Sequence, residues 1–380
     1  MADRPSPRRV VLVHDWLTGM RGGEKVLESL CRLYPDADLL TLVHVPGAVS
    51  PVIEHRRVRT SVIQRLPAPA RWYREYLPLF PFAIEQFDLD TASLVISTSH
   101  CAAKAVVPTG RAVHVCYSHS PMRYAWDQFP SYFGPDRLGR AGSAAARHVV
   151  AWLARWDRDT AHRVHRFVAN SAYVAGRIGR YYNRRASVLH PPVDTEFFTP
   201  GHDAPGDYFL VVSALVPYKR IDTAIRAAAR LGAPLKIVGT GPDAEHLQAI
   251  AGSGVEFLGR VDDDTLRQLY RGARALVLPG EEDFGIAPVE ALACGRPVVA
   301  LGLGGACETV EQGVSGWLVD PAVTGDAARV EAFADAMARV DDLPLSSSAL
   351  HDRGAMFGVD RFDASFRQII ADTVERPDAW

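Results

Sequence analysis

The sequence predicts an α/β protein built from two doubly wound domains, each a parallel β-sheet with helices on both faces. Short apolar runs rich in β-branched residues alternate with longer segments of helical spacing along the whole chain. These runs lack period-2 alternation, which is typical of parallel strands that are buried on both faces. A stretch rich in proline and glycine, residues 190–206, separates two sets of such runs and indicates a domain boundary. The length of 380 residues is typical of a chain with two to three domains.

Each half of the chain contains five expected strands. In the first half they are residues 10–13, 39–43, 94–97, 112–117 and 166–169. In the second half they are residues 208–213, 235–238, 255–258, 275–278 and 297–301. Helices are expected at residues 24–33, 221–231, 244–251 and 263–273. We therefore expect an N-terminal domain at 1–192, a second domain at 205–360, and a helix at 361–380 that packs back towards the first domain.

The composition is that of an ordinary globular protein, with 48% hydrophobic and 23% charged residues. This excludes a disordered chain, a collagen and a coiled coil. The formal net charge of -2 conceals an uneven distribution. Residues 1–192 hold 26 Lys and Arg against 15 Asp and Glu, whereas the rest of the chain holds 16 against 29. We expect no nucleic-acid partner, and a basic half that suits an anionic partner.

The cysteines and the apolar runs bear on the cellular location. Five cysteines are spread along the chain without a C-x-x-C pair, which favours a reducing cytoplasm over a disulfide framework or a zinc site. No run reaches the 18 apolar residues of a membrane-spanning helix. Residues 67–87 are crowded with aromatic residues beside arginines, so they could lie on the inner face of the membrane or cradle a lipid-linked acceptor. The alternative is an amphipathic segment that is partly buried.

The most informative segment is residues 278–297, which follow an expected strand. Gly285 allows a ligand to approach the backbone, and Pro288 suits the first turn of a helix that Gly295 ends. The amides of Phe284, Gly285 and Ile286 would then open a helix, which is a favourable site for phosphate.

Two glutamates in this segment are candidates for ligand contacts. Glu282 precedes the expected helix and Glu290 lies about one turn inside it. Both could accept hydrogen bonds from the hydroxyls of one elongated ligand. The alternative is a pair of surface carboxylates on an ordinary strand–helix turn.

The run E-D-F-G-I-A-P-V-E-A-L-A-C-G-R-P-V-V at 282–299 resembles the E-x7-E signature of retaining glycosyltransferase family 4. The resemblance continues in V-H-D-W-L-T-G-M-R-G-G-E-K at 13–25, C-Y-S-H-S-P-M-R-Y-A-W-D at 116–127, H-P-P-V-D at 190–194, L-V-P-Y-K-R-I-D at 215–222 and V-G-T-G-P at 238–242. It implies the GT-B fold, with two Rossmann-like domains facing across a cleft, and a nucleotide-diphosphate sugar as donor. It also implies that the domain at 1–192 is the acceptor side and that the domain at 205–360 binds the donor. The M-R-Y-A-W-D and P-Y-K-R forms are similar to a branch with GDP-mannose-dependent mannosyltransferases of polysaccharide and lipid-linked glycan assembly.

The resemblance assigns roles to the charged residues of the second half. It implies that Glu282 orients the sugar hydroxyls and that Glu290 holds the nucleotide ribose. Lys219, one of only four lysines beside 38 arginines, would neutralise the departing diphosphate, unless it is a solvated loop lysine. The family usually has an arginine shortly before this lysine, where this chain has Ala214; Arg220 could compensate.

The first half supplies further candidates. His119 follows an expected strand, and the resemblance implies that it touches the donor sugar; a satisfied structural histidine is the alternative. Asp15, Trp16 and Arg123 are expected to contact the acceptor. The remaining candidates for donor binding are Gly22, Gly23, Gly239, Gly241 and Arg260. For Gly239 and Gly241, tight packing is an equally good explanation.

The resulting expectation is a retaining glycosyltransferase that moves a hexose, with mannose from GDP-mannose as the first choice, to a hydroxyl of a glycan or lipid-linked acceptor. The resemblance implies attack from the same face, with the leaving phosphate taking the proton. The sequence has no His/Cys ligand cluster, so neither a metal nor another cofactor is expected. The alternatives are a GT-B-fold nucleotide-sugar epimerase, a phosphorylase, and a non-catalytic protein that binds nucleotide sugars.

Overall fold

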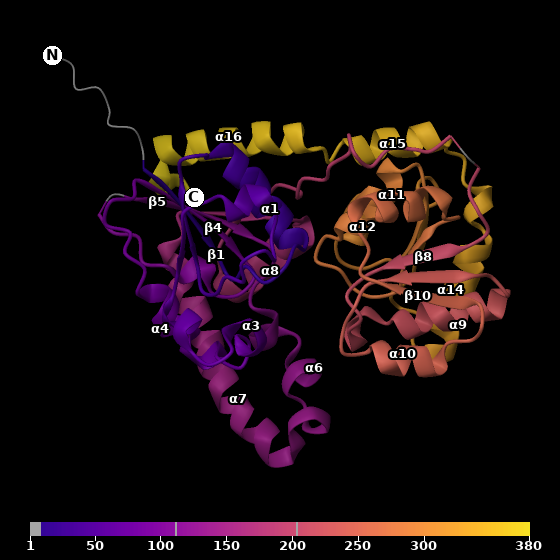
Figure 1. Cartoon of the computed structure of the whole chain (residues 1–380), viewed down its shortest axis with the longest axis horizontal. Helices are drawn as coiled ribbons and strands as arrows, with labels where there is room; N and C mark the ends of the chain where they lie inside the picture. Colours follow the sequence, from indigo (N-terminus) through magenta and orange to yellow (C-terminus); the bar gives the residue numbers. More distant parts are fainter. Residues whose placement is uncertain (1–8, 111, 203) are drawn as a thin grey trace. The chain divides into compact units, whose positions relative to one another are not determined.

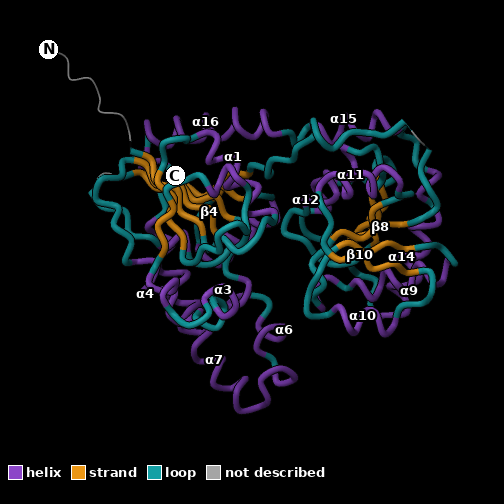
Figure 2. The backbone as a smooth tube through the Cα atoms, viewed as in Figure 1, coloured by secondary structure: helices purple, strands orange, loops and turns teal. Residues whose placement is uncertain are grey.

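The computed structural model describes residues 9–110, 112–202 and 204–380. It divides the chain into two compact units: unit 1 is Met1–Pro192 with Phe362–Trp380, and unit 2 is Val193–Arg361 (Figure 1). Each unit contains one parallel sheet with helices around it (Figure 2). The predicted fold class of two Rossmann-like α/β domains is therefore confirmed.

The sheet of unit 1 has seven strands in the order β3-β2-β1-β4-β5-β6-β7, all of them parallel. The strands are β1 (Val10–His14), β2 (Asp38–Thr41), β3 (Val58–Thr60), β4 (Leu94–Ser99), β5 (Val113–Ser118), β6 (Arg166–Ala169) and β7 (Ala186–Val188). The strand order reverses direction between β1 and β4. In sheets of this kind the crevice at such a reversal, outside the carboxyl ends of the strands, is where ligands bind.

Two hydrophobic cores lie on the two faces of this sheet, because successive residues of a strand point to opposite faces. Val11 and Val13 of β1 belong to one core, whereas Leu12 belongs to the other. The second core also contains Phe362 and Phe366 from the last helix, so this helix is part of the packing of unit 1. The helices of unit 1 are α1 (Gly22–Leu33), α2 (Pro51–Glu54), α3 (Pro69–Trp72), α4 (Phe80–Glu85), α5 (Arg123–Trp126), α6 (Phe129–Phe133), α7 (Pro135–Asp159), α8 (Ala172–Tyr182) and, from Phe362 on, α16 (Val359–Glu375).

The sheet of unit 2 has six parallel strands in the order β10-β9-β8-β11-β12-β13. The strands are β8 (Phe209–Val212), β9 (Leu235–Val238), β10 (Val255–Gly259), β11 (Leu276–Leu278), β12 (Val298–Leu301) and β13 (Gly316–Val319). The helices are α9 (Ile221–Leu231), α10 (Ala244–Ile250), α11 (Asp263–Gly272), α12 (Ile286–Ala293), α13 (Ala306–Thr309), α14 (Asp326–Ala338) and α15 (Ser347–Ala355). Here the order reverses between β8 and β11, so these two strands mark the expected ligand crevice of this unit.

The ten expected strands are all present, with ends that differ by at most two residues. The sequence analysis missed β3, β7 and β13, each of which lies at an edge of its sheet. An edge strand pairs on one side only and is partly exposed, so these strands do not form long apolar runs. Two helices begin two residues earlier than predicted, α1 at Gly22 and α16 at Val359. At the start of α1 the Glu24 carboxylate accepts a hydrogen bond from the Arg21 amide at 3.0 Å.

Helix α7 is the longest helix, and it is interrupted at Gly139, where φ is +67°. Its arginines lie on a helix that is mostly exposed, with Val150 and Leu153 among the few residues turned towards the core. In the part of the chain that the structure describes, no helix combines the length and the apolar character needed to cross a membrane.

Candidate functional site

The crevice of unit 2 brings together Lys219 and Glu282, which are 63 residues apart in the sequence. Lys219 ends the short 3-10 helix η5 (Pro217–Lys219) after β8, and Glu282 follows the neighbouring strand β11. Their side chains form an ion pair, Lys219 Nζ with Glu282 Oε2, and Nζ also lies 3.4 Å from the carbonyl oxygen of Glu281. Both side chains are mostly buried, with 11% and 21% of their surface exposed. The lysine is therefore held at the crevice by Glu282.

Helix α12 begins at this ion pair. Gly285 is its N-cap and has φ of +85°, a backbone conformation that side chains strain, which explains a glycine at this position. The helix then runs from Ile286, with Pro288 in its first turn, and Gly295 follows its end. The start of a helix presents backbone N–H groups and the positive end of the helix dipole. The ring of Phe284 is buried against Phe357, so of this residue only the backbone faces the turn.

Glu290 is buried inside α12, with 4% of its surface exposed. Its Oε2 accepts a hydrogen bond of 2.8 Å from the hydroxyl of Tyr270 on α11. Burial, and then the charge of Glu290, raise the pKa of Tyr270 well above 10, so the tyrosine stays protonated and donates. The sequence analysis missed Tyr270, because its position inside α11 looks like that of any core aromatic residue.

The other candidates of unit 2 have structural partners. Arg220 has φ of +50°, and its guanidinium pairs with Asp222 and with Asp326 at 3.0 and 2.8 Å. These hydrogen bonds raise the pKa of Arg220 against the effect of burial and tie the start of α9 to the start of α14. A role of Arg220 in donor binding stays a prediction. Arg260 is exposed after β10.

The two glycines after β9 are explained by packing. A Cβ atom at Gly239 would lie 1.8 Å from the carbonyl oxygen of Ser213, and one at Gly241 would lie 2.1 Å from that of Leu215. Only glycine allows the loop after β9 to approach the loop after β8 this closely. Contact with a nucleotide at these positions stays a prediction.

In unit 1, three histidines gather at the crevice between β1 and β4. His14 ends β1, His100 follows β4, and His119 follows β5. The ring centroid of His100 lies 6.3 Å from that of His14 and 6.3 Å from that of His119. Gly23 lies beside them, since a Cβ atom there would be 3.5 Å from His119 Nε2 and 3.6 Å from His14 Cε1. Gly22 and Gly23 were expected in the loop before α1, and this is wrong: they form the first turn of the helix.

The charge states at this crevice follow from burial and from neighbouring groups. Burial, together with the charges of His100 and His14, lowers the pKa of His119 well below 6.5. His119 Nε2 is buried and has no hydrogen-bond partner among the described residues. Burial alone would raise the pKa of Glu24, but its interaction with His14, whose Nε2 lies 3.8 Å from Glu24 Oε1, outweighs that effect and lowers the pKa below 4.5.

Asp15 and Trp16 were expected to contact an acceptor, but in this structure neither side chain offers an atom to one. Asp15 is fully buried, and its two carboxylate oxygens accept the backbone N–H groups of residues 100–103 at 2.6–3.0 Å. Trp16 is 2% exposed and packs on Tyr73 with a ring-centroid distance of 5.1 Å. The residue that both of them contact is His100, which the sequence analysis did not select. A histidine three residues after the expected strand 94–97 was the available signal.

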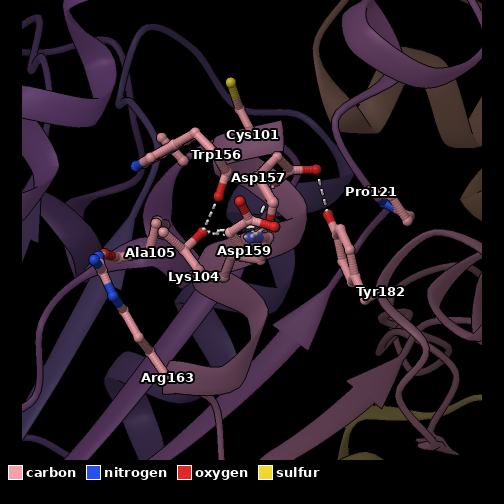
Figure 3. A network of polar contacts seen from close by, with 12 residues as sticks. Cys101, Lys104, Ala105, Pro121, Trp156, Asp157, Asp159, Arg163 and Tyr182 are labelled. Atoms are coloured by element: carbon pink, nitrogen blue, oxygen red, sulfur yellow. Dashed lines mark hydrogen bonds and ion pairs between the residues drawn. The ribbon is translucent and has the colours of Figure 1, made fainter. Parts of the chain in front are cut away.

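Arg123 begins the short helix α5 and is half-buried. A buried polar network holds the end of this helix: Asp157 Oδ2 accepts the indole N–H of Trp126 at 2.7 Å and the hydroxyl of Tyr182 at 2.8 Å. The other oxygen of Asp157 lies 3.0 Å from Nζ of Lys104, which is 1% exposed (Figure 3). Contact of Arg123 with an acceptor stays a prediction.

Within residues 9–110, 112–202 and 204–380 there is no group of three or more His, Cys, Asp or Glu side chains that could hold a metal ion.

Comparison with protein families gives a match over most of unit 2: residues 206–341 match the family model described as "Glycosyl transferases group 1". Among curated proteins, the chain is 35% identical over 223 residues to the D-inositol 3-phosphate glycosyltransferase of Mycolicibacterium vanbaalenii, which covers 50% of this chain and 49% of that protein. It is 36% identical over 191 residues to the protein of the same name from Geodermatophilus obscurus, covering 41% and 42%. The chain thus spans about half the length of the curated relatives it matches.

Solved structures share the fold over nearly the whole chain. Sucrose-phosphate synthase from Thermosynechococcus elongatus has a TM-score of 0.70 at 19% identity, covering 97% of this chain and 100% of that one. Anabaena HepE in complex with UDP-glucose has a TM-score of 0.68 at 18% identity, covering 96% and 99%. At these identities the likeness shows the fold alone, which is that of GT-B glycosyltransferases.

Proposed function

We propose that this chain is a retaining glycosyltransferase that transfers a hexose, mannose from GDP-mannose, to a hydroxyl of a glycan or lipid-linked acceptor. The observation that carries the proposal is the ion pair of Lys219 and Glu282 at the β8/β11 crevice, directly before the start of α12 and one helical turn from the buried Glu290. A cation, a helix N-terminus and two carboxylates in one crevice fit a nucleotide-diphosphate sugar, which carries both phosphates and hydroxyls.

The ion pair also suggests how the donor is received. The diphosphate of the donor competes with Glu282 for Lys219, and it gains the positive end of α12 as a second partner. Glu282, released from the lysine, then accepts hydrogen bonds from the sugar hydroxyls, while Glu290 accepts those of the ribose. As the bond to the anomeric carbon breaks, Lys219 and the helix start stabilise the charge that develops on the diphosphate.

The comparisons support the donor class and leave the sugar and the base open to test. Solved neighbours contain UDP, UDP with glucose, or UDP-glucose. The choice of GDP-mannose rests on the M-R-Y-A-W-D and P-Y-K-R forms of this chain. The curated relatives act on D-inositol 3-phosphate by their names, so this compound belongs in the acceptor panel beside mannosides and polyprenyl-linked glycans.

The test is a turnover assay with GDP-, UDP- and ADP-sugars, with and without acceptors, on the wild-type protein and on Lys219→Met and Glu282→Gln. We expect one donor to be consumed and both variants to lose about 100-fold or more in turnover. Lys236→Met is the matched control, because Lys236 lies on β9, 31% exposed and 3.6 Å from Glu256, outside the crevice. Loss of turnover in this control as well, or full activity of Lys219→Met, would show that the site is misassigned. An epimerised donor without acceptor would favour the epimerase, and binding without turnover the non-catalytic protein.

We further propose that unit 1 associates peripherally with the inner face of the cytoplasmic membrane. The support is a set of exposed apolar side chains on α3, η2 (Leu77–Leu79) and α4: Trp72 at 43%, Leu79 at 45% and Phe82 at 61%. Arg71 and Arg74 are exposed beside them, and basic residues next to an apolar surface suit anionic lipid. Flotation with phosphatidylglycerol vesicles at low salt tests this: we expect binding that Trp72→Ala with Phe82→Ala abolishes, and no flotation of the wild-type protein would refute it.

A further inference from the structure

A pocket of about 490 Å³ lies on unit 1 along the last turns of α7. Its lining includes Trp152, Arg155, Trp156 and Asp159, and it reaches Arg163 in the turn that follows the helix. Spacings of three and four residues place side chains on one face of a helix, so the lining residues of α7 form one continuous stripe. The volume is in the range of pockets that bind small molecules.

One carboxylate fixes two walls of this pocket. Glu85 Oε1, at the end of α4, accepts the indole N–H of Trp156 at 2.9 Å and a guanidinium N–H of Arg163 at 2.8 Å. Nη1 of Arg163 also donates to the carbonyl oxygen of Ala105 at 2.6 Å (Figure 3). Nζ of the buried Lys104 lies 5.9 Å from the centre of the Trp156 ring. Because the protein itself holds both side chains, a ligand meets a preformed surface and loses less free energy in ordering it.

The two indoles of the pocket are one helical turn apart. Trp156 is half-buried, whereas Trp152 is 45% exposed. An indole ring is negative on its face, so it packs well against the C–H groups on one face of a pyranose ring. The carboxylate of Asp159 and the guanidinium of Arg155 line the same pocket, and they supply an acceptor and donors for hydroxyl groups. Aromatic rings next to donors and acceptors suit a saccharide better than an acyl chain.

The charges at the pocket do not cancel. Arg158 pairs with Asp159 at 3.0 Å, and Arg163 pairs with Glu85 at 2.8 Å. Arg155 is exposed, and its Nε donates to a carbonyl oxygen of its own helix at 3.4 Å, but it forms no ion pair among the described residues. One guanidinium is therefore left for an anionic group, and the planar fork of arginine suits a carboxylate.

We propose that this pocket binds an acidic saccharide, a sugar chain with carboxylate groups, whose rings stack on Trp152 and Trp156 and whose carboxylate pairs with Arg155. Among the described residues, the lining of the pocket shares none with the crevice of unit 1, where His14 and His119 lie at the ends of strands. The inference goes beyond the proposed transferase function. It needs no donor, so binding is measured in the absence of one.

The test is calorimetry of the full chain with acidic tetrasaccharides from hyaluronan, polygalacturonate and polymannuronate, and with the neutral N-acetylchitotetraose and maltotetraose. We expect an acidic tetrasaccharide to bind about 5-fold or more tightly than the neutral ones at low salt, and to lose this advantage at high salt. Trp152→Ala should weaken its binding about 10-fold or more, because the exposed aromatic anchor is removed. Arg155→Gln should abolish the preference for the acidic ligand and leave the affinity for the neutral ones within about 2-fold of wild type.

Controls on the same helix separate this site from general effects. Val149 and Arg140 are exposed on α7 and do not line the pocket, so Val149→Ala and Arg140→Gln should bind as the wild type does. All variants should keep the thermal midpoint of the wild type. No binding of any acidic tetrasaccharide would overturn the proposal, and so would binding that Trp152→Ala leaves unchanged, since the sugar would then occupy another site. A protein that binds the sugar at this pocket but consumes no nucleotide sugar would refute the transferase function and support this inference.

Discussion

His114 makes the stability of this protein depend on pH in a way that can be calculated. The residue lies on β5 and is fully buried, with Nε2 2.8 Å from Ser97 Oγ and Nδ1 3.1 Å from the carbonyl oxygen of Arg163. The carbonyl can only accept, so Nδ1 donates to it and Nε2 accepts from the serine hydroxyl. A ring with one proton, on Nδ1, is the neutral form of histidine. Burial lowers the pKa of His114 from 6.5 to about 3.

The sign of the effect follows from proton binding. Below pH 6.5 the unfolded chain binds a proton at His114 that the folded protein does not bind, so stability is fully present above pH 6.5 and falls as the pH falls towards 3. With about 1.4 kcal/mol per pH unit, this residue alone should remove about 2 kcal/mol of unfolding free energy between pH 7.5 and pH 5.

The assay is urea unfolding from pH 7.5 to pH 5, followed by tryptophan fluorescence, which reports mainly on unit 1 because Trp317 is the one tryptophan of the sequence in unit 2. His114→Gln removes the titrating group. Between pH 7.5 and pH 5 the unfolding free energy of this variant should therefore decrease by about 2 kcal/mol less than that of the wild type. The variant loses some stability at every pH, and only the difference in slope is compared. Equal slopes would refute the assignment of a neutral, buried His114.

Three further changes have expected outcomes. Asp15→Asn should lower the free energy of unfolding by about 2–6 kcal/mol in urea, because an amide in place of one oxygen leaves two backbone N–H groups without an acceptor; a loss below 1 kcal/mol would contradict this. On the proposed function, Tyr270→Phe should weaken GDP binding about 5-fold in calorimetry and leave 2′,3′-dideoxy-GDP unaffected, since in that proposal the tyrosine acts through Glu290 on the ribose; equal weakening of both ligands would contradict that role. Lys104→Met should cost about 3–5 kcal/mol by leaving Asp157 buried without its cation, and Lys104→Met with Asp157→Leu should recover most of it; no recovery would show that the ion pair is not the cause.

The sequence predicted the sheets well because their central strands are apolar on both faces. Strands β6 and β9 coincide with the expected residues 166–169 and 235–238. Helix α11 begins one residue after Asp262, whose carboxylate accepts the amide of Thr265 at 2.7 Å, and this start at Asp263 coincides with the expected one. Three of the four edge strands were missed, and only β10 was predicted. An edge strand pairs on one side and is partly exposed, so a short polar strand such as β3 has no pattern that distinguishes it from a loop.

Prediction of the site was uneven for a different reason. Lys219 was selected as a rare lysine after a strand, and Glu282 because it precedes a glycine and a helix start. The structure brings the two together because their strands are neighbours in the sheet, and their roles in binding stay predictions. Tyr270 was missed because its function is to hold another side chain, and spacing along a helix does not show which buried hydroxyl has a carboxylate opposite it. Such pairs depend on the packing of α11 on α12, which sequence periodicity does not specify.

Asp15 shows why a polar residue at the end of a strand is ambiguous. In both units the crevice lies where the strand order reverses, and polar residues there can either meet a ligand or build the loop that meets it. Four backbone N–H groups point at the Asp15 carboxylate, which leaves it no free acceptor for a substrate but fixes the turn that carries His100. A turn with four converging amides needs a buried anion. Asp15 after β1 and the turn that begins at His100 after β4 therefore depend on each other, although 85 residues separate Asp15 from His100. A substitution of Asp15 should therefore change the position of His100 through this turn, and its effect should stay within unit 1.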